Sequence, residues 1–88
     1  MADRVAYISI MMNPKHLGRL VRNRRRNFGL SQRDLAEIAG ISVHGLSNIE
    51  SGKGNPTLAV LNLLAETLGM DLKLEVRLPG RQATGPEA

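Results

Sequence analysis

The stretch Ser31-Gln-Arg-Asp-Leu-Ala-Glu-Ile-Ala-Gly-Ile-Ser-Val-His-Gly-Leu-Ser-Asn-Ile-Glu50 contains two short helical patterns with a turn between them. Ser31 can cap the first helix, because its hydroxyl can accept a hydrogen bond from a free N–H group of the first turn. Gly40 can end that helix, since glycine enters the left-handed conformation of a helix C-terminus without a Cβ clash. The apolar residues between them recur at helical spacing and predict a buried stripe: Leu35, Ala36, Ile38 and Ala39.

A second helical pattern follows after a single apolar residue. Ser42 is its N-cap candidate, and Leu46 and Ile49 give the helix an apolar side. Small Ala36 on the first helix leaves room for the second to cross it closely, as a helix-turn-helix unit requires. The opposite side of the second helix carries residues that can face a partner: Val43, His44, Ser47 and Asn48.

The same stretch resembles the XRE-type, lambda-repressor-like DNA-binding domains. The match keeps its register at Gln32, Leu35, Ala36, Gly40, Leu46, Ile49, Glu50 and Gly52. Within that superfamily, residues 20–26, 57–61 and 68–76 are most similar to HipB-type antitoxins, the DNA-binding halves of HipA/HipB toxin–antitoxin modules. The resemblance implies an all-α, lambda-repressor-like four-helix domain with a helix-turn-helix, and a C-terminal β-strand that pairs across a homodimer.

The charge of the chain favours a polyanionic partner. Twelve basic and eight acidic residues give a net charge of +4, and no carboxylate side chain lies between Asp3 and Asp34. Scattered charges on a helix usually form a solvated face. Beside a helix-turn-helix pattern, however, a concentrated positive field indicates nucleic-acid binding.

Composition limits the other classes of function. The chain has no cysteine, which excludes a disulfide and a cysteine-based metal site and suits a reducing cytoplasm. No stretch reaches the roughly 18 apolar residues of a membrane span. The two histidines, His16 and His44, lie in different helical patterns, and no glycine-rich phosphate loop is present. We therefore expect no enzymatic activity, cofactor, metal or small-molecule ligand.

Residues 13–69 are expected to form the DNA-binding domain, after an N-terminal arm or extension at residues 1–12. Asn13 and Pro14 are a helix-start signal, and this helix should end at Asn27 before Gly29. Its expected core face consists of Leu17, Leu20, Val21 and Phe28. The resemblance implies a partly buried ion pair between Arg25 on this helix and Glu50, which makes Arg25 more structural than DNA-binding.

The last predicted helix, from Leu58 to Leu68, is apolar on more than one side. One face supplies the core with Leu58, Leu61, Leu64, Ala65 and Leu68. Val60 and Leu63 place further apolar groups elsewhere, and a second subunit is the simplest cover for them.

Residues 70–79 change to a period of two. The apolar residues Leu72, Leu74, Val76 and Leu78 alternate with charged ones, which is typical of a half-buried strand. The chain offers no clear internal partner edge, so this strand is expected to pair with its copy in a homodimer. Residues 80–88 are expected to be a flexible tail.

The resemblance also implies how the domain would read DNA. Val43, His44, Ser47 and Asn48 match base-facing positions, while Gln32 and Ser42 match positions at helix N-termini that touch phosphate or the edge of the groove. Asn48 has the chemistry to pair with adenine. Two alternatives stay open, because Val43 could cap the core and His44 could be an ordinary exposed residue. Further phosphate contacts are expected from Arg22, Arg33 and Lys53.

Three functions remain open at this point. The first is an antitoxin and autorepressor that binds an inverted-repeat operator as a dimer and neutralises a HipA-like serine/threonine kinase. The second is a stand-alone repressor of phage or mobile-element type. The third, which the sequence favours least, is a protein-interaction module without specific DNA binding.

Overall fold

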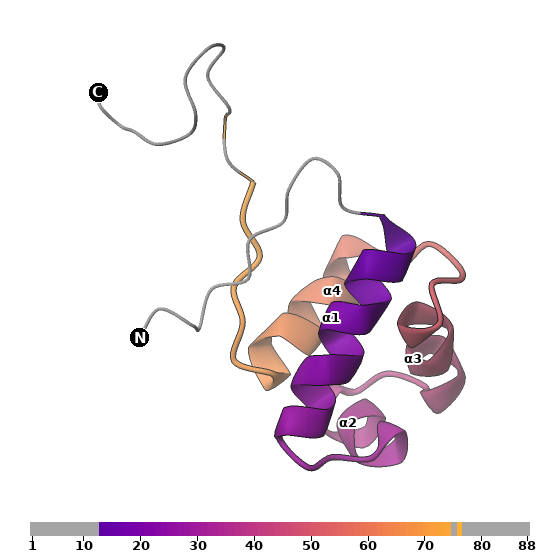
Figure 1. Cartoon of the computed structure of the whole chain (residues 1–88). Coiled ribbons are helices and arrows are strands. Elements are labelled where there is room, and N and C mark those ends of the chain that lie inside the picture. Colours follow the sequence, from indigo (N-terminus) through magenta and orange to yellow (C-terminus); the bar gives the residue numbers. More distant parts are fainter. Residues whose placement is uncertain (1–12, 75, 77–88) are drawn as a thin grey trace.

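Four helices make up the domain in the computed structural model, which describes residues 13–74 and 76. They are α1 (Pro14–Asn27), α2 (Gln32–Ala39), α3 (Val43–Glu50) and α4 (Leu58–Thr67). In Figure 1, α1 runs through the middle of the view, with α2 at its C-terminal end and α3 and α4 on opposite sides. The all-α, four-helix domain predicted from the sequence is confirmed.

Local signals in the sequence set where the helices begin and end. Asn13, Ser31, Ser42 and Thr57 each accept a hydrogen bond from a backbone N–H of the helix that follows. At Ser31 the arrangement is reciprocal, because the Asp34 carboxylate also accepts from the Ser31 N–H. A glycine with positive φ follows each helix, and the next N–H group returns to a carbonyl of its last turn.

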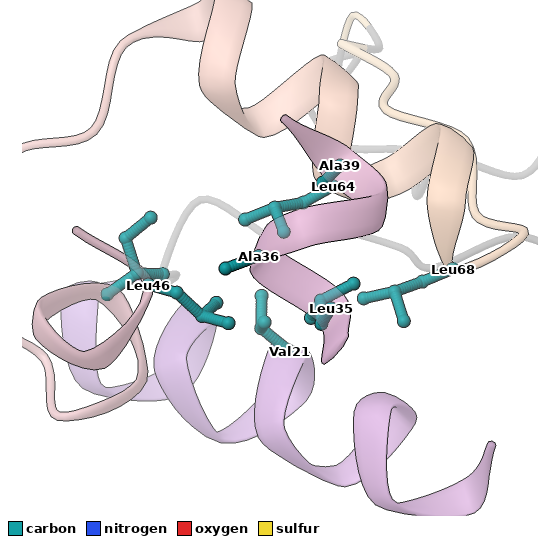
Figure 2. Packing of buried hydrophobic residues seen from close by; sticks show 8 residues of the cluster. Val21, Leu35, Ala36, Ala39, Leu46, Leu64 and Leu68 are labelled. Carbon is teal, nitrogen blue, oxygen red and sulfur yellow. The ribbon is translucent and has the colours of Figure 1, made fainter. Parts of the chain in front are cut away.

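The core lies between all four helices, with α2 in its centre. Figure 2 shows Val21 of α1, Leu46 of α3, Leu64 of α4 and Leu68 just after α4 converging on the buried side of α2. Leu35 and Leu46 are completely buried, and burial of one such leucine contributes about 1.5–3 kcal/mol. The full cluster is Val21, Leu35, Ala36, Ala39, Leu46, Ile49, Leu64 and Leu68.

Three residues that the periodicity assigned to the core lie on the surface instead. Phe28 is 51% exposed just beyond α1, where the Arg24 guanidinium lies 5.2 Å from its ring centroid. Ile38 and Leu58 are 62% and 66% exposed. A domain this small fills its interior with fewer apolar residues than the helical pattern supplies.

Val60, which was expected at the dimer interface, is half-buried and packs against the core of its own chain. The structure of one chain therefore gives Val60 a place at the edge of the core, and its part in a dimer stays a prediction. Leu63 remains 40% exposed, as an interface residue of α4 would be.

The alternating sequence after α4 is typical of a strand. Within the described residues 70–74 and 76, however, this segment forms no regular strand. Asp71 forms an isolated β-bridge. Leu74 and Val76 are 100% and 83% exposed, and Leu72 is half-buried. Leu78, the arm at residues 1–12 and the tail at residues 80–88 lie outside the described residues. Among the helices described, none is long and apolar enough to cross a membrane.

Candidate nucleic-acid interface

A buried ion pair holds α1 against the end of α3. Arg25 Nε donates to Glu50 Oε2 at 2.7 Å, and Arg25 Nη2 donates to Glu50 Oε1 at 2.9 Å. The two side chains are only 10% and 2% exposed. Arg25 Nη1 also donates to the Leu30 carbonyl at 2.8 Å, so the guanidinium uses its whole fork inside the protein. This is the ion pair expected from the resemblance.

Gln32 extends this network to α2. Its Nε2 donates to Glu50 Oε1 at 3.1 Å, and Arg22 Nε lies 4.0 Å from the same oxygen. One carboxylate therefore joins α1, α2 and α3. Gln32 is the first residue of α2 and is half-buried, so its structural bond to Glu50 adds to the phosphate contact expected of it.

The surroundings of Glu50 favour its charged form. Burial alone would raise the pKa of this carboxyl, but hydrogen bonds from Arg25 and Gln32, with the charges of Arg25 and Arg22, lower it below its ordinary value. Hydrogen bonding to Glu50 raises the pKa of the Arg25 guanidinium, although burial opposes this. Both groups are charged at neutral pH.

Gly18 allows α1 and α3 to approach this closely. A Cβ atom at Gly18 would lie 2.5 Å from the Ile49 carbonyl oxygen and 2.6 Å from that of Glu50. No other residue fits without a shift of the backbone. This role was not predicted from the sequence, although a glycine in the middle of a strong helical pattern was the signal.

The face of α3 opposite the core carries the four predicted base-facing residues. Val43 is 43% exposed and His44 is exposed, while Ser47 and Asn48 are half-buried. Val43 is not among the residues packed in or against the core cluster. Asn48 Nδ2 lies 3.4 Å from His44 Nε2, one turn earlier on the helix. The arrangement presents a row of small polar groups and one methyl-bearing side chain along one side of α3.

Ser42 serves first as the N-cap of α3. Its hydroxyl accepts a hydrogen bond from the Gly45 N–H at 2.9 Å. Ser42, Asn48 and Lys53 also border one open groove between α3 and α4. The positive end of the α3 dipole therefore lies beside the exposed row of α3.

The three predicted basic contacts lie on different elements: Arg22 on α1, Arg33 on α2 and Lys53 after α3. Lys53 follows α3, with its N–H bound to the Asn48 carbonyl at 2.8 Å and its side chain exposed. Arg33 is exposed on α2, and the Arg22 side chain is 42% exposed beside Glu50. All three cations are at least partly exposed and are available to an anionic partner.

Comparison with known proteins gives consistent matches over the same region. The helix-turn-helix family model matches residues 21–74. The HTH-type transcriptional regulator DdrOP3 of Deinococcus deserti is 41% identical over 68 residues, or 74% of this chain, which spans only 53% of that relative. The ImmF control region 10 kDa protein of Bacillus phage phi105 is 33% identical over 64 residues, covering 73% of this chain and 71% of the phage protein.

The fold also matches solved structures. One is a chain in the structure of a HipA-HipB-O2-O3 complex, with a TM-score of 0.65 and 25% sequence identity. That match covers 78% of the present chain and 97% of the other. The matched region therefore includes residues outside α2 and α3.

Proposed function

The chain belongs to the XRE family of helix-turn-helix DNA-binding regulators, and from this premise we propose that it is the antitoxin and autorepressor of a two-gene toxin–antitoxin module. In this proposal a dimer binds an inverted-repeat operator in its own promoter. The same dimer holds a HipA-like serine/threonine kinase inactive.

The exposed side of α3 is the observation that carries the DNA-binding part. Val43 and Asn48 have complementary base chemistry, since a valine methyl can contact thymine and an amide can pair with adenine. His44 and Ser47 add hydrogen-bonding groups that can reach base edges. The buried Glu50 network supports this role, because it fixes the orientation of α3 relative to α1 and α2.

The antitoxin part is supported by similarity on both sides of α2 and α3. Residues 20–26, 57–61 and 68–76 are similar to HipB-type antitoxins. The matched chain of the HipA-HipB-O2-O3 complex is covered almost completely. The similarity to a phage control-region protein favours the alternative, a stand-alone repressor without a toxin partner.

The apolar surface that one chain leaves uncovered supports dimerisation. Leu63, Leu74 and Val76 are exposed, and Leu72 is half-buried beside them in sequence. Pairing of residues 70–79 between two copies would cover Leu72, Leu74 and Val76, and Leu78 continues the same alternation in the sequence. A two-fold dimer then presents its α3 helices about 34 Å apart, one turn of B-DNA, which calls for an inverted repeat.

Co-expression of the tagged protein with its neighbouring genes tests the function as a whole. We expect a kinase-sized protein to co-purify, and sizing with promoter DNA should give one complex of dimer, partner and DNA. A lone dimer that still shifts the promoter would support the stand-alone repressor. A chain that binds neither DNA nor a partner would overturn both proposals.

Single substitutions test the DNA-binding residues. Asn48→Ala should relax base preference at one operator position and cost about 1–3 kcal/mol of binding free energy. Lys53→Ala should weaken binding to all sequences alike and reduce the salt slope by about 0.9. Titrations of operator and scrambled duplex at several salt concentrations separate the two effects. Equal losses on both duplexes for Asn48→Ala would contradict its role in base reading.

A further inference from the structure

The arginines of α1 divide into two groups with different surroundings. Arg24 and Arg25 are used within the domain. Arg24 Nε donates to the Leu68 carbonyl at 2.9 Å, where α4 ends, and Arg25 binds Glu50. Both are committed to holding α1 against its neighbours, although the sequence places them in one continuous run with Arg26.

The remaining cations of α1 form a separate row on the surface. Lys15, Arg19, Arg22 and Arg26 follow one another at intervals of four, three and four residues. Such intervals place side chains on one face of a helix. We refer to these four residues as the α1 basic stripe. Lys15, Arg19 and Arg26 are exposed, and the Arg22 side chain is 42% exposed.

Helix stability favours Arg26, a cation in the last turn of α1, but does not account for the rest of the α1 basic stripe. Like charges three and four residues apart destabilise a helix, and a cation in the first turn opposes the helix dipole. Within the part of the chain that the structure describes, only Arg22 of the stripe has a carboxylate within 4.0 Å. The other three cations gain no ion pair there to offset their mutual repulsion.

Two residues of the stripe, Lys15 and Arg22, lie beside the C-terminal end of α3. At one end Lys15 packs against Gly52, so closely that a Cβ there would lie 2.9 Å from Lys15 Cγ. Farther along, Arg22 lies beside Glu50, to which Gln32 also binds. The stripe thus runs past the C-terminal end of α3 and reaches the start of α2.

We infer that the α1 basic stripe binds the phosphates of duplex DNA that flanks the half-site read by α3. From Lys15 to Arg26 the helix rises about 16 Å, which matches roughly five phosphates of one strand along the duplex axis. The contact is independent of sequence and extends the footprint of each protomer. This inference rests on the proposed DNA-binding function.

Duplex DNA fits the stripe better than an acidic protein does. Protein interfaces have a buried centre rich in aromatic and apolar side chains. In α1, all of whose residues the structure describes, no large apolar side chain is exposed. The positions next to the stripe are polar as well, including His16 and Asn23. Binding of a regularly charged polyanion such as duplex DNA requires only the cations of the stripe.

The test combines a triple variant, Lys15→Gln/Arg19→Gln/Arg26→Gln, with two lengths of operator duplex. One duplex ends at the outer edges of the half-sites, and the other carries ten further base pairs of arbitrary sequence on each side. Arg22 is left in place because it lies beside Glu50. Arg19→Gln compared with Lys73→Gln, which removes one exposed cation from the segment after α4, provides a matched pair of single variants.

Wild-type protein should bind the long duplex more tightly than the short one, and the triple variant should lose this gain. On the long duplex its affinity should fall by on the order of tenfold or more, with the salt slope reduced by about 0.9 for each lost phosphate contact. Discrimination between operator and scrambled DNA should persist. The control variant Lys73→Gln should change neither the affinity for the long duplex nor the salt slope.

Several outcomes would overturn the inference. Identical salt slopes for the triple variant and wild type would mean that the stripe meets no phosphate. Equal losses on both duplex lengths would place the contacts inside the half-site. Loss of a co-purifying partner with unchanged DNA binding would assign the stripe to a protein. Failure of wild-type protein to distinguish operator from scrambled DNA would instead refute the proposed function itself.

Discussion

The carboxylate of Glu50 accepts hydrogen bonds from Arg25 and Gln32 inside the domain. Arg25→Met should lower the free energy of unfolding by about 3–5 kcal/mol, because it leaves the Glu50 charge buried without its main cation. The double variant Arg25→Met/Glu50→Leu should recover much of that loss, since it removes both charges. Urea denaturation of the single and double variants measures the difference. A double variant as unstable as the sum of Arg25→Met and Glu50→Leu would show no energetic coupling between the two residues and would contradict this prediction.

The lowered pKa of Glu50 also makes stability depend on pH. A carboxyl with a folded-state pKa below its unfolded value of about 4.5 stabilises the protein above that pH. This contribution is lost as the pH falls through the folded-state pKa. We therefore expect the free energy of unfolding to decrease below about pH 4.5, with a shallower slope in Glu50→Gln. Glu37→Gln, which removes an exposed carboxylate of α2, is the matched control. A Glu50→Gln slope no shallower than that of the control would contradict the assignment.

Between elements, the contact of α1 with α3 depends on the absence of a side chain at Gly18. Gly18→Ala gains about 1 kcal/mol in helix propensity. The added Cβ would nevertheless lie 2.5 Å from the Ile49 carbonyl oxygen, so the two helices must separate. We expect a net loss of about 1–3 kcal/mol from overpacking. Thermal denaturation measures it, and Asn23→Ala on the exposed side of α1 is the control that should not destabilise.

Operator binding gives a second measure of the same contact. In the proposed complex, displacement of α3 from α1 would change the angle at which α3 enters the major groove of the DNA. At a temperature where Gly18→Ala is fully folded, its operator affinity should therefore fall while Asn23→Ala binds as wild type. Unchanged affinity together with unchanged stability would mean that the backbone accommodates the methyl group without moving α3.

The helices themselves could be predicted because their signals are local. Ser31 caps the very turn that it precedes, and Gly40 ends the helix that it follows. Burial was less predictable, since helical periodicity cannot say how many neighbours the rest of the chain supplies. Phe28, Ile38 and Leu58 fit the pattern of a core face but lie beyond the edges of a small core.

The candidate site also contains some features that could be predicted from the sequence and others that could not. The row on α3 could be predicted, because side chains opposite Leu46 and Ile49 must face away from the core. The second role of Gln32, as a donor to Glu50, could not, since it depends on two residues eighteen positions apart meeting in space. The separation of the α1 cations into bonded and exposed groups likewise required the packing of α1 against α3 and α4.

For the molecule as a whole, the decisive question is what covers the apolar segment after α4. Leu74 is fully exposed in a single chain, so Leu74→Lys should leave the four-helix domain intact and act only on association. In sedimentation experiments wild-type protein should be a dimer at micromolar concentration and Leu74→Lys a monomer. Lys73→Gln, on the polar side of the predicted strand, should remain dimeric.

The same variant should separate affinity for a half-site from affinity for the full operator. Two linked DNA-binding domains gain on the order of 10²–10⁴ in affinity over one, provided that both half-sites can be bound together. Leu74→Lys should therefore lose most of its affinity for an inverted repeat, yet bind a single half-site like one wild-type protomer. Circular dichroism should show unchanged helix content. If Leu74→Lys dimerised and bound the full operator as wild type does, residues 70–79 could not be the dimerisation strand, and the exposed part of α4 around Leu63 would become the candidate interface.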